Sequence, residues 1–183
     1  MNLWLRLLLV VIGSMFRPRL GFLDESVLRM RVWPTDLDPN VHMNNARYLS
    51  VMDLGRFDLI LRTGMGRVLR RKGWRPLMGA AWVRYRRALA PFERFEIRSR
   101  FVGWDERRSY VEHRILVNGE LSCHAIMWAG FRRGAERVAP GELARELGLP
   151  ETSPPLPAWV QHWRALDASV SESQAAPPAR AAE

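Results

Sequence analysis

The sequence has few of the residues that build disulfide or metal scaffolds. It contains one cysteine, Cys123, and four histidines in 183 residues. A single cysteine excludes an internal disulfide framework and a cysteine-based zinc site. The histidines show no metal-ligand spacing, so we expect no metal and no other cofactor. The absence of disulfides fits a reduced, cytoplasmic compartment, and no apolar run reaches the ~20 residues of a membrane-spanning helix.

Lysine is nearly absent as well, because Lys72 is the only one among 28 Lys and Arg residues. Against 19 Asp and Glu, these residues leave a formal net charge of +9. Such a charge favours acidic partners, for example the phosphates of coenzyme A, an acidic carrier protein or anionic lipid. The eight Trp are spread over the chain with no aromatic–basic motif, so we expect no nucleic acid.

The two ends differ in composition from the middle. Residues 1–19 are apolar except for a few arginines, and two interpretations stay open: an anchor on the cytoplasmic face of the membrane, or an arm that packs on the domain or on a partner subunit. Residues 151–167 combine a Pro-rich connector with a short helix bearing Trp159 and Trp163, which we expect to pack on the domain. Residues 168–183 are small and polar, which predicts disorder.

The middle, residues 25–150, reads as one domain of strand, helix and then strands. Period-2 alternation predicts a strand over 26–33 and further strands over 77–89, 94–103, 107–117 and 120–132. Between them, a helix over 45–62 is apolar on most sides and is therefore expected to be buried. Asn118-Gly119 is typical of a type I′ hairpin turn. The pattern indicates an α+β architecture, with an antiparallel sheet wrapped around one long central helix.

The loop before that helix gathers polar side chains. Asp36, Asp38, Asn40 and His42 lie within seven residues, and Asn44 is a good N-cap. A helix N-terminus presents unpaired N–H groups that can hold an oxyanion, and a carboxylate beside them can act as a base or a nucleophile. The same residue types also form turns and caps, so a purely structural role stays open.

The segment DLDPNVHMNNARYL, residues 36–49, resembles the signature of the hot-dog thioesterases. It is similar to the 4-hydroxybenzoyl-CoA thioesterase branch and to plant acyl-carrier-protein thioesterases. Tyr85-Arg86-Arg87, Gly103-Trp104-Asp105 and the prolines at 154–157 resemble the thioesterase superfamily member proteins. The resemblance covers about residues 25–165. It implies the hot-dog fold, a catalytic Asp38, and roles for Asn40 and His42 in placing water and the carbonyl.

The activity implied is hydrolysis of acyl-CoA or acyl-carrier-protein thioesters to a free acid and a thiol. A backbone N–H from residues 41–43 would polarise the carbonyl, although Val41 stands where many bacterial members have Gly. Substrate contacts are expected at Val41, Met43, Asn44, Asn45, Tyr48, Asp53, Arg86 and Arg87. The alternative is a catalytically degenerate hot-dog domain that binds acyl chains or acyl-CoA without hydrolysis. A homodimer or homotetramer is expected, because a single sheet leaves an open edge.

Other charged residues have structural explanations that compete with functional ones. Asp53 and Arg56 are spaced i, i+3 on the predicted helix, which suits a buried ion pair. His113 shares a strand face with apolar residues and is expected to be a hydrogen-bonded core residue. The basic segment 67–72 suits either a solvated face or the phosphates of coenzyme A.

Overall fold

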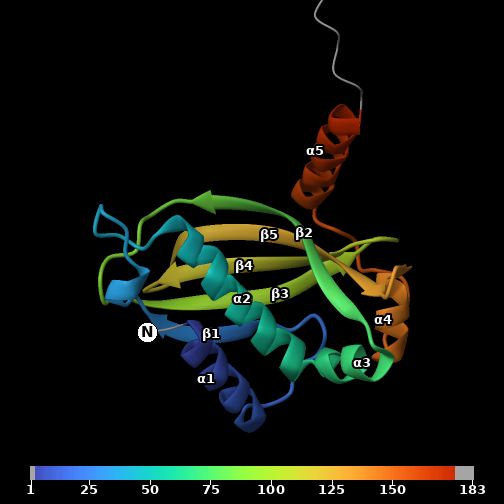
Figure 1. Ribbon diagram of the computed structural model, residues 1–183, viewed down its shortest axis with the longest axis horizontal. Helices are drawn as coiled ribbons and strands as arrows, with labels where there is room; N and C mark the ends of the chain where they lie inside the picture. The colour runs from blue at the N-terminus through green and yellow to red at the C-terminus, as the bar shows by residue number, and fades with distance from the viewer. Residues whose placement is uncertain (1–2, 176–183) are drawn as a thin grey trace, which may run out of the picture.

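The computed structural model describes residues 3–175, in which one antiparallel sheet curls around a long helix (Figure 1). The strands are β1 (Ser26–Arg31), β2 (Arg75–Tyr85), β3 (Arg94–Trp104), β4 (Ser109–Val117), β5 (Glu120–Arg133) and β6 (Glu136–Val138). Their order is β1-β3-β4-β5-β2, and β6 pairs with β5. The predicted α+β architecture is confirmed.

The Asn118-Gly119 hairpin has the expected geometry. Val117 pairs with Glu120, and the two turn residues have φ values of 50° and 85°. Two consecutive positive φ angles are the mark of the type I′ turn, which matches the twist of the flanking strands. The local sequence therefore determined this connection.

The helices are α1 (Leu3–Phe16), α2 (Asn45–Arg62), α3 (Met65–Lys72), α4 (Pro140–Glu146) and α5 (Ala158–Ala175), together with the short 3₁₀ helix η1 (Pro34–Asp36). Helix α2 begins and ends where the sequence predicted. It crosses the concave face of the sheet, with Tyr48, Met52 and Leu59 at most 2% exposed. Gly55 permits this close approach, because a Cβ built there would clash with Ser99 Oγ.

Helix α2 is not buried on all sides, which corrects the expectation from its composition. Leu49, Phe57 and Leu61 remain exposed on the side turned away from the sheet. The sheet covers only one face of the helix, and α1 packs against another part of it. An apolar strip of α2 is therefore open in the single chain.

The basic segment 67–72 is helical, whereas no helix was expected there. It forms α3, flanked by Gly64 and Gly73 in the left-handed conformation with φ of 80° and 67°. Met65, Val68 and Leu69 form its buried face. These three residues have the i, i+3, i+4 spacing of an amphipathic helix. A stretch of eight residues is too short for this spacing alone to predict a helix.

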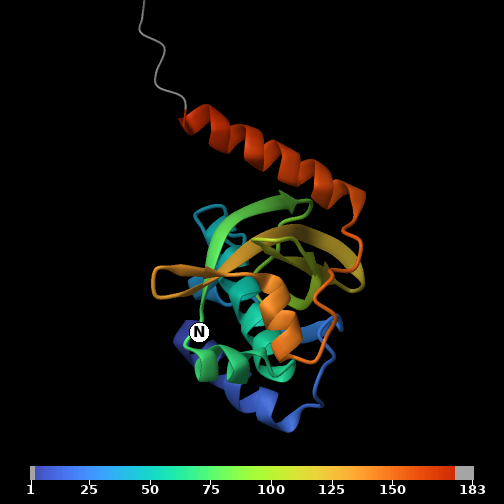
Figure 2. The ribbon, with the colours of Figure 1, turned by 90° about the vertical axis from the view of Figure 1, so that its right-hand side faces the viewer.

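Helix α5 lies across the outer face of the sheet and extends beyond it (Figure 2). Val160 is fully buried there, and the ring of Trp163 lies 6.2 Å from that of Tyr110. The helix continues to Ala175, whereas disorder was expected from residue 168 onward. Each residue added to an existing helix gains one backbone hydrogen bond without a new nucleation cost. The composition of residues 168–175 alone does not show that a helix precedes them, so it did not predict this extension. Residues 176–183 of the predicted tail lie outside the described residues.

Strand β2 forms one free edge of the sheet. It ends at Tyr85 rather than at the predicted residue 89, and nearly all of its residues are exposed on both faces. Its exposed apolar and aromatic side chains are Leu77, Met78, Trp82 and Tyr85, and Arg75 and Arg84 are exposed beside them. An edge strand with such side chains is a template for pairing with another chain.

Candidate active site

The loop between β1 and α2 is a closed structure rather than an open link. Leu37 and Met43 form an antiparallel bridge at its base. One residue further from the tip on each side, the amide of Asn44 donates to the carbonyl of Asp36 at 2.8 Å. Residues 38–42 are therefore the tip of a small hairpin that leads directly into α2.

Asp38 sits at this tip with its two carboxylate oxygens in different roles. Oδ1 accepts hydrogen bonds from the amides of Asn40 at 2.9 Å and His42 at 3.4 Å. Oδ2 bonds to no other described residue. The side chain is half-buried. One oxygen therefore fixes the carboxylate, and the other is available to a water molecule or a substrate.

Asn40 and His42 lie on the same tip but are not joined to Asp38 through their side chains. Both are exposed, and within residues 3–175 neither side chain makes a hydrogen bond. The Asp38–Asn40–His42 triplet is thus placed together by the loop, but its side chains form no hydrogen-bonded chain.

Val41 adopts a conformation that favours glycine. Its φ is 59°, in the left-handed region where a β-branched side chain is strained. The turn requires this angle, because the amide of Val41 donates to the carbonyl of Asp38 at 3.0 Å. This explains in physical terms why glycine suits the position in similar sequences. The Val41 side chain itself is exposed.

The amides of residues 41–43, one of which was expected to polarise the substrate, all have acceptors within the protein. The amide of Val41 is bonded to Asp38, and that of His42 points to Asp38 Oδ1. The amide of Met43 donates to the carbonyl of Leu89 at 2.9 Å, and the Met43 side chain is in the core. All three donors are used within the protein, because the loop needs them to close.

An unused amide lies at the start of α2. The side-chain oxygen of Asn44 accepts a hydrogen bond from the amide of Ala46 at 2.9 Å. The backbone carbonyl of Asn44 accepts from the amide of Arg47 at 2.8 Å. The amide of Asn45, the first helical residue, donates to no described group, and Asn45 is exposed. A helix N-terminus carries a partial positive charge, so this N–H suits a carbonyl oxygen or an oxyanion.

Residues 85–89 run beside the first turns of α2. The hydroxyl of Tyr85 donates to the carbonyl of Asn45 at 3.2 Å, and the amide of Leu89 donates to the hydroxyl of Tyr48 at 3.0 Å. The rings of Tyr48 and Tyr85 meet edge to face at 5.2 Å. Burial raises the pKa of Tyr48, so its hydroxyl stays neutral and serves as a support for the loop. Tyr48 is therefore a structural residue more than a substrate contact.

This segment also brings Arg86 and Arg87 to the start of α2. Arg87 forms an ion pair with Glu93 at 2.6 Å, and this hydrogen bond lowers the pKa of Glu93. Arg86 is exposed and has no ion-pair partner among residues 3–175. Of the two, Arg86 has the free charge for an anionic ligand.

Asp53 and His113, for which a structural and a functional role were both considered, interact with other residues of the domain. Asp53 pairs with Arg56 at 2.7 Å, as expected. The Asp53 side chain is 46% exposed, however, so the expectation that this pair is buried is wrong. His113 is fully buried, and its Nδ1 lies 2.8 Å from Ser99 Oγ, as predicted for a core histidine. Burial, with the charge of Arg56, lowers the pKa of His113 to about 3.

Within the described part of the chain, no group of three or more His, Cys, Asp or Glu residues is placed to hold a metal ion.

Two buried carboxylates form ion pairs that were not expected from the sequence, where Asp36 was named only as a loop residue and Asp58 was not singled out. Asp36 pairs with Arg6 of α1 at 2.5 Å, and Asp58 of α2 pairs with Arg17 at 3.2 Å and with Arg62 at 3.1 Å. The available signal was the presence of Arg6 and Arg17 in an apolar segment, since a buried charge needs an opposite partner.

The sequence is similar to known proteins over most of its length. The pattern of the thioesterase-like superfamily matches residues 32–164. Protein THEM6 of Danio rerio is 35% identical over 164 residues, which cover 86% of this chain and 80% of that protein.

Solved structures give the same fold. A DHNA-CoA thioesterase from Staphylococcus aureus has a TM-score of 0.59 and 15% identity, over 81% of this chain and 95% of that chain. A thioesterase from Thermus thermophilus, solved with coenzyme A and Zn, has a TM-score of 0.58 and 26% identity, over 66% of this chain and 89% of that chain. The predicted hot-dog fold is confirmed, and the chain belongs to the thioesterase-like superfamily.

Proposed function

We propose that the protein hydrolyses acyl-CoA thioesters to a carboxylic acid and free coenzyme A. One observation carries the proposal. The open Oδ2 of Asp38 lies at the tip of the closed hairpin, and the unused amide of Asn45 is that of the first helical residue, directly after this hairpin. A base or nucleophile beside an oxyanion donor is what acyl transfer to water requires.

The proposed reaction begins with the thioester oxygen accepting a hydrogen bond from the amide of Asn45. Asp38 then takes a proton from water, whose oxygen attacks the carbonyl carbon. The C–S bond breaks as the tetrahedral intermediate collapses, and the proton that Asp38 took from water passes to the departing sulfur, so coenzyme A leaves as the thiol. In the second variant, a carboxylate oxygen of Asp38 attacks the carbonyl carbon, the C–S bond breaks with departure of the thiolate, and water then hydrolyses the resulting mixed anhydride. Asn40 and His42 lie on the same tip, where their side chains are free to position the water.

Arg86 is the proposed contact for the phosphates of coenzyme A. Its charge is uncompensated by any residue within 3–175, whereas Arg87 is paired with Glu93. In the basic segment 67–72, Arg71 and Lys72 are likewise paired, both with Glu146. Arg86 therefore ranks above these residues as a binding site for phosphate.

We further propose that two copies pair through their β2 edges. The support is the exposed apolar side chains of β2 and the uncovered strip of α2 that carries Leu49 and Phe57. Pairing along β2 would cover both features and would enclose the space beside the loop of Asp38.

The test is release of free thiol from a panel of acyl-CoAs of graded length and from the matching acyl-carrier-protein thioesters. Wild type and Asp38→Asn are compared, and each is also titrated with a non-hydrolysable acyl-CoA thioether. Hydrolysis by wild type that Asp38→Asn lacks supports the proposal. Binding of the thioether by wild type with no hydrolysis of any substrate replaces it with an acyl-binding role.

A further inference from the structure

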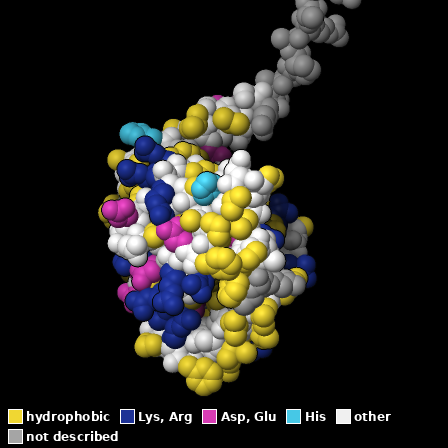
Figure 3. Space-filling view, turned by 90° about the vertical axis from the view of Figure 1, so that its left-hand side faces the viewer, with side chains coloured by type: hydrophobic (Ala, Val, Ile, Leu, Met, Phe, Trp, Pro, Cys, Tyr) yellow, Lys and Arg dark blue, Asp and Glu magenta, His cyan; other side chains and the backbone are white. Residues whose placement is uncertain are grey.

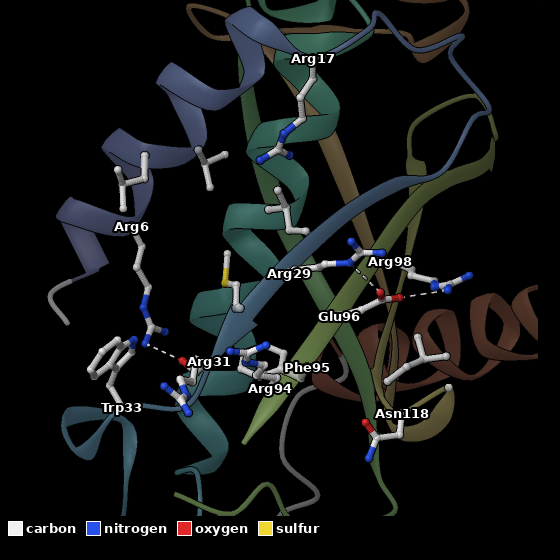
Figure 4. A pocket seen from close by; sticks show the side chains of 16 residues that line it. Arg6, Arg17, Arg29, Arg31, Trp33, Arg94, Phe95, Glu96, Arg98 and Asn118 are labelled. Atoms are coloured by element: carbon white, nitrogen blue, oxygen red, sulfur yellow. Dashed lines mark hydrogen bonds and ion pairs between the residues drawn. The ribbon is translucent and has the colours of Figure 1, made fainter. Parts of the chain in front are cut away.

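Helix α1 is oriented with its charged residues toward the protein. Arg6 is 4% exposed and donates to Asp36 Oδ2, and it also reaches the carbonyl of Arg31 at 3.3 Å (Figure 4). Arg17, directly after the helix, pairs with the fully buried Asp58. These ion pairs and the buried Val10 fix which face of α1 contacts the domain.

The opposite face of α1 is apolar and open to solvent. It consists of side chains at i, i+3 and i+4 spacing, namely Leu5, Leu8, Leu9, Ile12, Met15 and Phe16. Met15 is 77% exposed and Phe16 is 84% exposed. A surface helix in water has the reverse pattern, with its apolar stripe toward the core and its charges outward. A contiguous apolar face of this kind marks an interaction surface.

A groove of about 740 Å³ adjoins this face. It lies between α1 and the strands β1 and β3, and Leu9 shares it with Arg29, Arg31 and Arg94 (Figure 4). Arg29 is paired with Glu96, whereas Arg31 donates to a backbone carbonyl and Arg94 has no ion pair among residues 3–175. Figure 3 shows a cluster of Lys and Arg side chains beside a band of hydrophobic side chains. The groove therefore has a net positive charge next to an apolar surface.

We propose that this face docks on an anionic lipid bilayer, with the apolar side of α1 in the interface and the arginine groove on lipid phosphates. The combination of an apolar helix face and neighbouring cationic side chains is the one that interfacial helices use. No helix of the described chain is long and apolar enough to cross a membrane. At ~1.5 Å per residue, the 14 residues of α1 are suited to lying in the membrane plane.

A second copy of the chain is the other occupant that an apolar face suggests. Charge argues against it, because two copies joined through this face would bring their arginine grooves together with little opposite charge between them. An anionic membrane supplies that opposite charge. The proposal concerns α1 and its groove alone, so it stands independently of any hydrolytic activity.

The test is flotation of the full chain with vesicles of phosphatidylcholine alone, and of equal parts of phosphatidylcholine and phosphatidylglycerol. Two variants probe the face: Met15→Ser with Phe16→Ser, and Arg31→Gln with Arg94→Gln. Point substitutions are preferable to removal of α1, because Arg6 and Val10 are buried. The matched control is Leu166→Ser with Val170→Ser, which removes two exposed apolar side chains from α5. A thermal melt of each variant shows that it is folded.

We expect wild type and the α5 control to bind the anionic vesicles equally. The Met15/Phe16 variant should bind at least about tenfold more weakly. The Arg31/Arg94 variant should lose the part of the binding that salt screens. Equal flotation of all four proteins, or flotation of none, would overturn the proposal. A self-association that Met15→Ser with Phe16→Ser abolishes, without vesicle binding by wild type, would assign the face to a second copy.

Discussion

Arg6 and Asp36 form a buried ion pair that joins helix α1 to the loop of the candidate active site. Nη2 of Arg6 lies 2.5 Å from Oδ2 of Asp36, and both side chains are at most 4% exposed. The same Oδ2 accepts from the amide of Trp33, and the carbonyl of Asp36 accepts from the amide of Asn44. The N-terminal helix thus supports the hairpin that holds Asp38.

Removing one partner of this pair should be costly. Arg6→Met leaves the Asp36 carboxylate buried without its counter-ion, and we expect a loss of about 3–5 kcal/mol in the free energy of unfolding. Adding Asp36→Asn removes the charge but keeps an oxygen for the amide of Trp33, so the double variant should recover most of the loss. Urea denaturation measures both. Arg29→Met, whose pair with Glu96 is exposed, is the control and should change stability by no more than about 1 kcal/mol.

The amide of Asn45 can be removed without disturbing the helix. Proline is well tolerated at the first helical position, and Asn44, with φ of −58° and ψ of 137°, already has the backbone that precedes proline. Asn45→Pro should therefore keep the melting temperature but lower kcat by ~10²–10³, as expected for loss of an oxyanion donor. Asn45→Ala keeps the amide and should remain active. Equal activity of the two variants would show that this N–H does not hold the oxyanion.

Val41→Gly should be tolerated or stabilising, although it removes a side chain. The change relieves a positive φ that costs a β-branched residue ~1–3 kcal/mol, against the ~0.5–1 kcal/mol by which glycine favours the unfolded chain. We expect a gain of up to about 2 kcal/mol in a urea titration. Val83→Gly, on strand β2, is the comparison and should be destabilising, because glycine is unfavourable in a strand. A loss at position 41 as large as that at position 83 would contradict the strain argument.

His113 should make stability depend on pH. Its pKa is about 3 in the folded protein, against 6.5 for an ordinary histidine, mainly because burial disfavours the charged ring and secondarily because of Arg56. Between these values the unfolded chain binds more protons than the folded one, so stability rises with pH and is lost as pH falls from 6.5 toward 3. The slope contributed by His113 approaches about 1.4 kcal/mol per pH unit.

The measurement is urea denaturation at pH 7 and pH 5, above most carboxyl titration. His113→Gln cannot gain the proton and should lose less stability than wild type over this interval. Glu112, which contacts His124 and Arg100, adds its own acid sensitivity at lower pH. Burial raises its pKa, but these hydrogen bonds outweigh that effect and hold it near 2. An unchanged pH dependence in His113→Gln would mean that the ring is protonated in the folded state.

Leu77→Lys should separate the proposed dimer. A lysine on the β2 edge places a charge against the partner's edge strand and blocks pairing. Sedimentation velocity should show pairs for wild type and single copies for the variant. Leu166→Lys, an exposed apolar position on α5, is the control and should leave the pairs intact. Wild type that sediments as a single copy at micromolar concentration would exclude the dimer.

Local sequence was sufficient where neighbouring residues alone set the backbone. The capping Asn44 and the run that ends before Gly64 determined the bounds of α2, and Asn118-Gly119 determined its hairpin. The polar loop before α2 was identified from residue types at fixed spacing. These features depend on backbone preferences and side-chain bonds that span a few residues, which a sequence displays directly.

Only the tertiary structure decided the use of the loop amides and the orientation of α1. The carbonyl of Leu89, more than forty residues from Met43, accepts from the amide of Met43, so this amide is not free and the proposed donor is the amide of Asn45. Likewise, Asp36 and Asp58 draw Arg6 and Arg17 inward and turn the apolar side of α1 outward. Both outcomes follow from the same physical rule, that a buried donor or charge must find a partner, and in these cases the partner is distant in the chain.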